Sequence, residues 1–393
     1  MDLKKSLENE KYLTDQLITY IGNKRALLTF IQEGLSFVQE KLGKKRFSTF
    51  DVFSGSGIVS RLLKQYSTSQ LANDMENYGR IISQCYLSNA REIDLNELKN
   101  IHESLNKKCL KSVKKYLTKD ECAFADFQKL PGFISSYYAP KDMLNIQSGE
   151  RCFYTPYNAC YIDCMRQLIE KNVPDKYKVF FIAPLLSQAS VHANTGGVFK
   201  GFYKNSKTGI GKFGGNGENA LSRIEGRIDL PFPVFSTYKS KVSIFQSEAN
   251  SLVSSEKIPE VDLAYIDPPY NQHPYGSNYF MLNLIADYKK PDESLLSKVS
   301  GIPKDWNRSM YNKKKYAAET FLDLVSTIKA KFLLVSFNNE GFIPMEEMTS
   351  LLNQIGKVTV MKSDYNAYRA SRNLKGRNIH TTEYLYIVEK GKS

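Results

Sequence analysis

The amino-acid sequence predicts a doubly wound α/β fold, in which a parallel sheet is interrupted by a long and largely helical insertion. Residues 261–266 form a short apolar run that stops at Asp267, which is typical of a buried strand in a parallel sheet. Residues 47–64 indicate a strand, a glycine turn and a helix in direct succession. The section from 78 to 238 is too long for a loop, and its first part carries apolar residues at helical spacing.

The composition is that of an ordinary globular protein with a strong positive charge. Of 393 residues, 42% are hydrophobic and 24% are charged, so the chain can bury a large core in one elaborate domain or two closely packed ones. The 54 lysines and arginines against 41 acids give a net charge of +13, which points to a polyanionic partner. Nucleic acid is the first candidate and a membrane surface the second.

Neither a membrane span nor a metal centre is expected. The sequence has no apolar run long enough to cross a bilayer, and the charged start at 1–5 lacks the apolar core of a signal peptide, so we expect a cytoplasmic protein. The six cysteines lack the paired short spacings of a zinc site. We interpret them as reduced packing residues.

The first motif is a glycine turn at 20–25 that leads into a helix, because apolar residues recur at helical spacing over 26–31. Gly22 and Asn23 tolerate tight or left-handed turns. Lys24 can place a cation beside a carboxylate or a phosphate. Taken alone, the motif favours a capped surface helix.

A second glycine turn separates a predicted strand from a predicted helix. The strand is the β-branched and aromatic run at 47–53, and the helix is the periodic run at 58–64. Gly55 and Gly57 lie between them and leave space for a ligand to approach the backbone. The turn holds only part of the three-glycine dinucleotide fingerprint, so its signal is weak by itself.

The next predicted strand, at 70–74, ends in an acid. Asp74 stands where a carboxylate accepts hydrogen bonds from ribose hydroxyls. The succession of strand, glycine turn, helix, strand and acid is what a nucleoside-bearing ligand requires. We therefore expect one cofactor pocket lined by Asp51, Gly55, Gly57 and Asp74.

The middle section predicts helices near 93–117 and 157–171. Lysines add a cationic face to the first of them, although a solvated helix surface has the same composition. We expect one domain in two parts, at 1–77 and 239–393, with the helical insertion at 78–238 between them.

Glycines, aromatic residues and lysines alternate between 192 and 217, which is not the composition of a linker. Nucleic-acid surfaces use cations for phosphates and flat side chains for bases. We favour contact with DNA over structural packing for this stretch. The candidate residues are Asn194, Lys200, Tyr203, Lys204 and Lys212.

Further strands are predicted at 241–246, 331–337 and 382–388. The first of them ends in a polar cluster, where Ala249 and Asn250 are expected to contact the adenine ring of a cofactor. A basic loop precedes the last strand and suits backbone phosphates, although a solvated charge run is a common alternative. Its candidate residues are Arg369, Arg372 and Lys375.

The tetrad Asp267-Pro268-Pro269-Tyr270 ends the strand at 261–266. Two prolines cannot continue a ladder, so the chain turns stiffly out of the sheet. The Asp267 carboxylate, the Pro268 carbonyl and the Tyr270 ring together suit a planar ring that bears an amino group. A strand-ending turn with a surface acid would have the same sequence. His273 in the next loop is more typical of a hydrogen-bonding residue than of an acid or base.

In combination, these motifs resemble the Dam-like group of DNA adenine-N6 methyltransferases, in the form found in restriction-modification systems. The resemblance covers most of the chain. Residues 20–24 resemble the family's amino-terminal cofactor motif, residues 51–57 its glycine motif, Asn73-Asp74 its ribose-binding acid and residues 267–270 its catalytic tetrad. Asn250 departs from the pattern, because relatives often have an acid there.

The resemblance implies a Rossmann-like, S-adenosylmethionine-dependent methyltransferase fold with a target-recognition region in the insertion. The implied catalytic residues are Asp267, Pro268, Pro269 and Tyr270. The implied cofactor-binding residues are Tyr20, Gly22, Asn23, Lys24, Asp51, Phe53, Ser54, Gly55, Gly57, Asp74, Ala249 and Asn250.

The implied reaction is methyl transfer to the N6 amino group of an adenine flipped out of double-stranded DNA. A cognate restriction endonuclease is a candidate partner, and the chain is expected to be a monomer or a weak dimer. Methylation of cytosine-N4 or of RNA is an alternative, although a serine at the position of Asp267 would favour cytosine. A non-catalytic nucleic-acid-binding protein with a degenerate methyltransferase fold is another.

Overall fold

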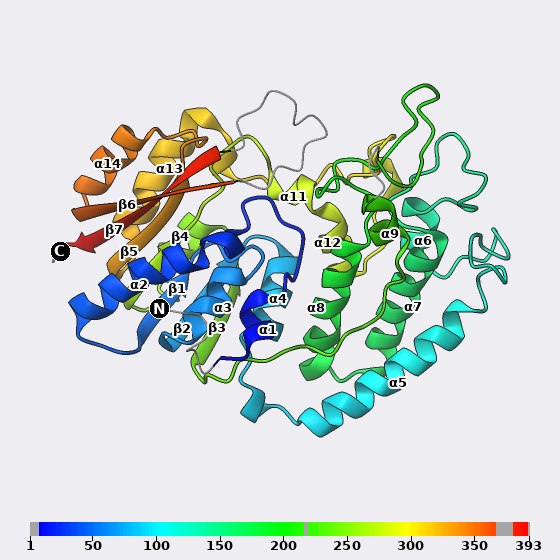
Figure 1. The fold of residues 1–393 in the computed structure, drawn as a ribbon, viewed down its shortest axis with the longest axis horizontal. Coiled ribbons are helices and arrows are strands. Elements are labelled where there is room, and N and C mark those ends of the chain that lie inside the picture. Colours follow the sequence, from blue (N-terminus) through cyan, green and yellow to red (C-terminus); the bar gives the residue numbers. More distant parts are fainter. Residues whose placement is uncertain (1–7, 216–218, 367–379, 392–393) are drawn as a thin grey trace.

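The computed structural model describes residues 8–215, 219–366 and 380–391, and within them it contains a seven-stranded sheet (Figure 1). The strand order is β3-β2-β1-β4-β5-β7-β6; β7 pairs antiparallel with both β5 and β6, and the other pairs are parallel. The strands are β1 (Phe47–Asp51), β2 (Ser67–Asp74), β3 (Lys241–Gln246), β4 (Val261–Ile266), β5 (Ala330–Asn338), β6 (Gly356–Asn366) and β7 (His380–Lys390).

The order of the strands has its switch point between β1 and β4, where the chain begins to add strands on the other side of β1. From β1 the chain moves outward to β2 and β3 on one side, whereas β4 and β5 extend the sheet on the other. β1 and β4 pair in parallel, with Asp51 opposite Tyr265. The carboxyl ends of these two strands therefore open the crevice in which such sheets bind ligands.

Each face of the sheet lies in its own hydrophobic core. Leu263 and Tyr265 of β4 belong to one core, and Ala264 and Ile266 belong to the other, because successive side chains point to opposite faces. This double burial explains the unbroken apolar run of β4. The helices that contribute to the first core are α2 (Leu28–Leu42), α3 (Ile58–Lys64) and α4 (Asn77–Tyr86), and those that contribute to the second are α10 (Ala249–Val253), α13 (Lys314–Thr327) and α14 (Met345–Asn353).

A layer of helices extends the first core away from the sheet (Figure 1). Asp94 caps α5 by accepting from the backbone N–H groups of the first turn, and Thr155 caps α7, which begins with proline. α8 carries apolar residues on all sides and is largely buried, as expected for an internal helix. The layer comprises α5 (Leu95–Val113), α6 (Phe133–Tyr138), α7 (Pro156–Asn172), α8 (Asp175–Val191), α9 (Asn219–Glu225), α11 (Tyr275–Asn278) and α12 (Phe280–Asp287), while the short α1 (Glu10–Thr14) packs on α3.

The helical layer draws on residues from both sides of the predicted insertion. α4 lies almost entirely within 78–238, yet it packs on β2 and β3 of the sheet. α12 lies beyond residue 238, yet it packs on α4 and α8. The chain that leaves the tetrad is therefore part of the same helical layer as the insertion.

Most predicted strands and helices are present, with shifted ends. The first strand stops at Asp51, so Val52 and Phe53 already belong to the turn. The second begins at Ser67 rather than Gln70. The edge strand β6 was not predicted, because its described side chains are only half-buried or exposed and give a weak apolar signal.

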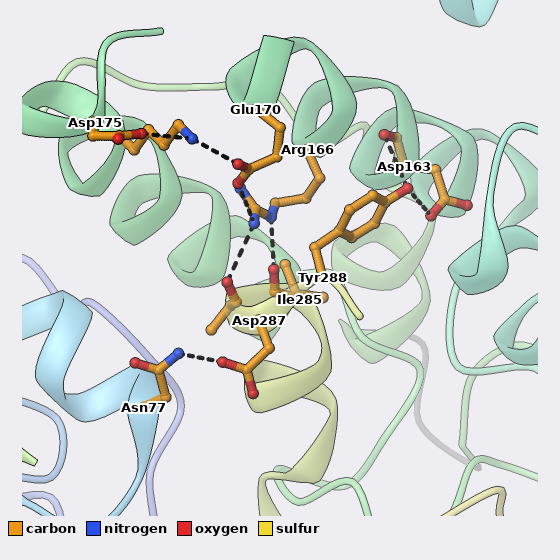
Figure 2. A network of polar contacts seen from close by, with 10 residues as sticks. Asn77, Asp163, Arg166, Glu170, Asp175, Ile285, Asp287 and Tyr288 are labelled. Carbon is orange, nitrogen blue, oxygen red and sulfur yellow. Dashed lines mark hydrogen bonds and ion pairs between the residues drawn. The ribbon is translucent and has the colours of Figure 1, made fainter. Parts of the chain in front are cut away.

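Within the helical layer, the buried Arg166 joins α7 to α12, as Figure 2 shows. Arg166 of α7 donates from Nε to the carbonyl of Ile285 at 2.7 Å and from a terminal nitrogen to the carbonyl of Ala286 at 3.2 Å. Glu170, one turn along α7, pairs with the same guanidinium at 2.9 Å. The network holds the C-terminal end of α12 against α7.

In the part of the chain that the structure describes, no helix is long and apolar enough to cross a bilayer. The same residues contain no group of three or more His, Cys, Asp or Glu side chains arranged to hold a metal ion. All six cysteines are free, and all except the half-buried Cys122 are buried. They act as packing residues.

Candidate active site

A cavity of about 890 Å³, open solvent at its mouth included, lies at the carboxyl ends of β1, β2 and β4. Eleven residues predicted from the sequence line it. They are Tyr20, Gly22, Lys24, Asp51, Phe53, Ser54, Gly55, Asp74, Ala249, Asp267 and Pro269. Five predicted residues lie outside this lining, namely Asn23, Gly57, Asn250, Pro268 and Tyr270.

The glycine turn after β1 has the backbone conformation that the sequence predicts. Gly55 and Gly57 have φ of +49° and +75°, which side chains other than glycine rarely adopt. A Cβ atom at Gly55 would lie 3.0 Å from the ring of Tyr20, so the absence of a side chain also preserves the cavity wall. Gly57 does not line the cavity and is the N-cap residue of α3.

Asp74 is buried at the end of β2, and both of its carboxylate oxygens are used inside the protein. Oδ2 accepts a hydrogen bond from Gly55 N at 2.6 Å, and Oδ1 accepts one from Glu76 N at 2.8 Å. Burial raises the pKa of Asp74 to about 6, against the opposing effect of these bonds. Asp74 therefore fixes the glycine turn through its hydrogen bond with Gly55 N, in addition to lining the cavity.

Asp51 ends β1 with one oxygen engaged and the other without a partner. Its Oδ2 accepts a hydrogen bond from Ser60 Oγ at 2.5 Å, whereas Oδ1 is buried and lacks a hydrogen bond among the described residues. Burial raises the pKa of Asp51 to about 7. A buried acceptor without a donor carries a desolvation cost, which a ligand in the cavity can offset.

Tyr20 is held over the cavity by two tyrosines of the chain that follows the tetrad. Its ring stacks on those of Tyr275 and Tyr279, with centroid separations of 4.9 and 4.7 Å. Ile21 completes the junction, because its N–H donates to Tyr279 Oη at 2.7 Å and its carbonyl accepts from Tyr275 Oη at 3.1 Å. Asn23, one residue beyond Gly22, faces away and accepts from Arg25 N, as a cap for the 3₁₀ helix Lys24–Leu27.

Lys24 lies in the wall of the cavity between two carboxylates. Its Nζ atom is 3.1 Å from Asp267 Oδ1 and 2.8 Å from Glu383 Oε1. All three side chains are largely or fully buried. Burial raises the pKa of Asp267 to about 6, Lys24 opposes this shift, and Glu383 adds to it. Sequence reasoning missed Glu383, which lies on β7 far along the chain from the tetrad.

Tyr270 is fixed beside the cavity mouth by β5. Its ring packs edge-on against Phe337 at 5.3 Å, and its hydroxyl accepts a hydrogen bond from Asn338 Nδ2 at 3.1 Å. The backbone carbonyl accepts from Phe342 N at 2.8 Å. Pro268, which follows Asp267 in the sequence, is buried. The exposed His273 does not line the cavity, so nothing in the geometry favours an acid or base role for it.

A segment that the sequence did not single out, residues 303–312, closes one side of the cavity. Asn307 Nδ2 donates to Glu76 Oε2 at 3.2 Å, and Asn312 Nδ2 donates to the carbonyl of Asn271 at 2.8 Å. Tyr311 donates from its hydroxyl to Asn250 Oδ1 at 2.8 Å. These contacts tie the segment to α4, to the loop after the tetrad and to α10.

The same contacts explain the position of Asn250. Its Nδ2 atom donates to the carbonyl of Thr320 at 2.8 Å and to Asp323 at 2.7 Å. The side chain therefore joins α10 to α13, and the structure does not bring this predicted residue into the lining of the cavity. Its neighbours Glu248 and Ala249 do line the cavity.

The basic and aromatic stretch forms a hairpin over 203–212. Lys212 N donates to the carbonyl of Tyr203 at 2.9 Å, and Lys204 lies 5.0 Å from the ring centre of Phe202. Lys200 is exposed at the base of the hairpin, and the other three candidates are half-buried. Arg369, Arg372 and Lys375 lie outside the described residues.

Asn194 does not belong to this surface. The side chain is fully buried, and Nδ2 donates to the carbonyls of Cys152 and Lys212 at 2.7 and 2.8 Å. Oδ1 accepts from Gly214 N at 3.0 Å. Asn194 therefore fixes the base of the hairpin, and the structure does not place it on the surface predicted to contact DNA.

The charge of the cavity is opposite to that of the whole chain. Among its lining residues, the acids are Asp51, Asp74, Glu76, Glu248 and Asp267, and the base is Lys24. A site with this excess of carboxylates attracts a cation and repels a phosphate. The cavity suits a positively charged ligand, and the basic remainder of the chain suits a polyanion.

This strand order, with a glycine turn after β1 and an Asp-Pro-Pro-Tyr tetrad after β4, defines a Rossmann-like methyltransferase of amino groups. The chain belongs to the D12 class of N6 adenine-specific DNA methyltransferases, whose family model matches residues 20–351. Members of this class use S-adenosylmethionine as methyl donor. The protein is thus an adenine-specific DNA methyltransferase.

Proteins similar to the chain include type II methyltransferases. It is 29% identical over 385 residues to the type II methyltransferase M.NlaIII of Neisseria lactamica, covering 95% of this chain and 99% of the relative. It is 28% identical over 379 residues to the type II methyltransferase M.CviAII of Paramecium bursaria Chlorella virus 1, covering 94% and 98%. It is 27% identical over 381 residues to the type II methyltransferase M.FokI of Planomicrobium okeanokoites. That alignment covers 94% of this chain but only 52% of the longer relative.

Proposed function

We propose that the cavity binds S-adenosylmethionine beside an adenine flipped out of double-stranded DNA, and that the chain is the modification enzyme of a type II restriction-modification system. Two type II methyltransferases that match over nearly their whole length support the second part. A restriction endonuclease that cuts the same unmethylated sequence is the partner that this assignment implies.

The observation that carries the proposal is the position of Asp267. Its carboxylate lies at the end of β4, in the wall of the cavity, and is held by Lys24 at 3.1 Å. The two following prolines stiffen the backbone there. Asp267 thus offers a fixed acceptor at the edge of the cavity.

The cofactor fits the residues that are present. Gly55 keeps the cavity wall free of a side chain, and Asp51 has a buried oxygen without a donor. The other residues proposed to hold the cofactor are Tyr20, Gly22, Lys24, Phe53, Ser54, Asp74 and Ala249. When bound, S-adenosylmethionine supplies an electrophilic methyl group on a positively charged sulfur, and the surrounding carboxylates stabilise that charge.

The target base must leave the helix to reach this site, since an amino group inside a duplex cannot enter a buried cavity. Flipping costs about a few kcal/mol for unstacking. Tyr270 offers a rigid ring on which the flipped base stacks, because Phe337 and Asn338 fix its position. The hairpin residues Lys200, Tyr203, Lys204 and Lys212 would contact the DNA, together with the basic residues Arg369, Arg372 and Lys375.

Asp267 and Pro268 orient the amino group for reaction. The Asp267 carboxylate and the Pro268 carbonyl each accept one hydrogen bond from N6, which draws the nitrogen lone pair out of conjugation with the ring. As the nitrogen–carbon bond forms and the carbon–sulfur bond breaks, positive charge develops on the nitrogen. A fixed carboxylate stabilises that charge more in the transition state than in the ground state, and the methylated nitrogen then gives up one proton to solvent water.

The test is to incubate the protein with labelled S-adenosylmethionine and unmethylated genomic DNA, to digest the DNA to nucleosides, and to sequence it by a modification-sensitive method. We expect label in N6-methyladenine within one recurrent motif. Label in N4-methylcytosine would overturn the base assignment. Label in RNA alone, or in neither nucleic acid, would overturn the proposal.

A further inference from the structure

Glu383 is buried beside the proposed active site, although it belongs to none of the motifs. Its Oε1 atom lies 2.8 Å from Lys24 Nζ and accepts a hydrogen bond from Ser336 Oγ at 2.6 Å. The side chain is 1% exposed, and β7 carries it between β5 and β6. A carboxylate in such a place is costly to bury and is retained only where it is paired.

The cluster that contains Glu383 carries more negative than positive charge. Lys24 bridges Glu383 and Asp267, so two carboxylates share one ammonium. Glu383 is buried and does not line the cavity, whereas Asp267 does. Burial disfavours the ammonium, but the two carboxylates outweigh it and raise the pKa of Lys24, which stays charged.

We propose that Glu383 is a positioning residue that anchors and neutralises Lys24, so that the cluster keeps one uncompensated negative charge beside the reacting amino group. The inference rests on the proposed function, because it takes Asp267 as the acceptor for that group. It goes beyond the proposed function by assigning the charge balance of the site to a residue on β7.

The need for a second carboxylate follows from the closeness of Lys24 to Asp267. An ammonium 3.1 Å from a carboxylate neutralises it and weakens its interaction with a positive charge that develops elsewhere. Asp267 nevertheless needs a partner that fixes its orientation. Lys24 supplies the orientation, and Glu383 offsets the charge of Lys24. The amino group of adenine then meets a fixed carboxylate whose negative charge is preserved.

The backbone makes this arrangement rigid. Glu383 pairs with Asn338 of β5 on one side and with Ser363 of β6 on the other. Ser336 fixes the carboxylate from the same β5 strand that holds Tyr270 through Asn338. Lys24 is consequently drawn toward a fixed point in the sheet, and its contact with Asp267 has a defined geometry.

The first test measures the charge on Asp267 directly in the ligand-free protein. The titratable side chains that interact with Asp267 are Lys24, Asp51, Tyr265, Tyr275 and Glu383, and the Tyr270 ring lies 5.4 Å from Lys24 Nζ. Carbon-13 NMR of aspartate-labelled protein, with the Asp267 signal assigned by Asp267→Asn, gives its titration midpoint. In Glu383→Gln we expect this midpoint to fall by about one pH unit, because Lys24 is no longer offset.

The second test measures single-turnover methylation against pH at saturating cofactor and DNA. Glu383→Gln keeps the acceptor for Ser336 and removes the charge. We expect the acidic limb of the pH–rate profile of this variant to shift to lower pH by the same amount as the NMR midpoint of Asp267. We expect its plateau rate to fall about 10- to 100-fold, with the calorimetric Kd for S-adenosylmethionine within about twofold of the wild-type value.

Two further variants separate this role from a loss of structure. Glu389→Gln makes the same change on the same strand at an exposed site and should leave both midpoints in place. Glu383→Gln introduced into Lys24→Gln should add little to the loss of rate, because the effect passes through Lys24. A coupling near zero between these two positions would contradict the inference.

An unchanged Asp267 midpoint in Glu383→Gln would also overturn it. If that variant does not fold, Ser336→Ala is used instead, and its midpoint must then move in the same direction by a smaller amount. Absence of DNA methylation by the wild-type protein would overturn the proposed function, and the NMR titration distinguishes that outcome from a failure of the charge balance.

Discussion

Two buried charge networks in this molecule are used in opposite ways. In the cavity wall, Lys24 lies between Asp267 and Glu383, and the buried Asp51 Oδ1 has no hydrogen bond among the described residues. In the helical layer, Arg166 donates to two backbone carbonyls at the end of α12 and pairs with Glu170 (Figure 2).

In the second network, backbone and hydroxyl donors bond the buried acid Asp163, while Arg166 Nη1 has no hydrogen bond among the described residues. The Asp163 carboxylate accepts from Ser135 N at 2.7 Å and from Tyr288 Oη at 2.8 Å. Neither Asp163 nor Arg166 lines the cavity. The comparison teaches that a buried charge bonded to backbone groups fixes helices, whereas a buried charge that faces a cavity with excess acceptors is available to a ligand.

The largest expected effect comes from removing the acceptor in the cavity wall. Asp267→Ala should lower the single-turnover methylation rate about 1,000-fold, because the developing charge on the amino group loses its carboxylate. The calorimetric Kd for S-adenosylmethionine should change little, since other residues supply most of the cofactor contacts. A rate within tenfold of the wild-type value would remove Asp267 from the catalytic role.

Breaking the helical network should instead reduce stability. Arg166→Met leaves the carbonyls of Ile285 and Ala286 without their donor and should lower the free energy of unfolding in urea by about 2–4 kcal/mol. Lys178→Met is the matched control, because Lys178 pairs with the same Glu170 at 2.7 Å nearer the surface and should cost about 0–1 kcal/mol. Equal losses in the two variants would contradict the comparison.

The sequence predicts the cavity network only in part, and the reason is the distance along the chain. The glycine turn, Asp74 and the tetrad have local signatures, since each combines a strand end with a specific turn. Glu383 and the segment at 303–312 reach the site through sheet order and long-range packing. Their local sequence does not contain that information, so no motif singled them out.

Polar side chains also mislead when their burial is unknown. Asn194 lies among lysines and aromatic residues, as a DNA contact would, but it is buried and bonded to three backbone groups. Asn250 occupies the position expected of a cofactor contact but joins two helices instead. In both cases the residue type fits two roles, and only packing decides between them.

A smaller effect is expected where the segment at 303–312 closes the cavity. A Cβ atom at Gly276 would lie 2.6 Å from the carbonyl oxygen of Asn307, so Gly276→Ala should displace this segment. We expect the affinity for S-adenosylmethionine to fall about tenfold. Trp306, the single tryptophan of the chain, lies in the segment and should report the displacement by fluorescence.

Gly201→Ala is the control for this prediction, because a Cβ atom there would meet no atom within 4 Å. Its cofactor affinity and its Trp306 fluorescence should match those of the wild-type protein. Unchanged fluorescence and affinity in Gly276→Ala would show that the segment does not control the cavity.

The last difference between the two networks concerns protons. Burial raises the pKa of Asp51 and Glu76 to about 7 and that of Asp74 and Asp267 to about 6, and all four line the cavity. Because these folded-state values exceed the unfolded ones, the stability that the four acids contribute is complete below about pH 4. It is lost as the pH rises through 6 and 7.

A cation in the cavity favours the ionised acids, so binding of S-adenosylmethionine near pH 6.5 should release about one proton, and its affinity should increase as the pH rises from about 5.5 to 7.5. Calorimetry in buffers of different ionisation enthalpy measures the release. S-adenosylhomocysteine, which lacks the charge on sulfur, should release fewer protons. Asp163, whose pKa burial also raises to about 6, lies in the other network and should keep its protonation state. Equal release by the two ligands would mean that the carboxylates of the cavity do not respond to the charge of the cofactor.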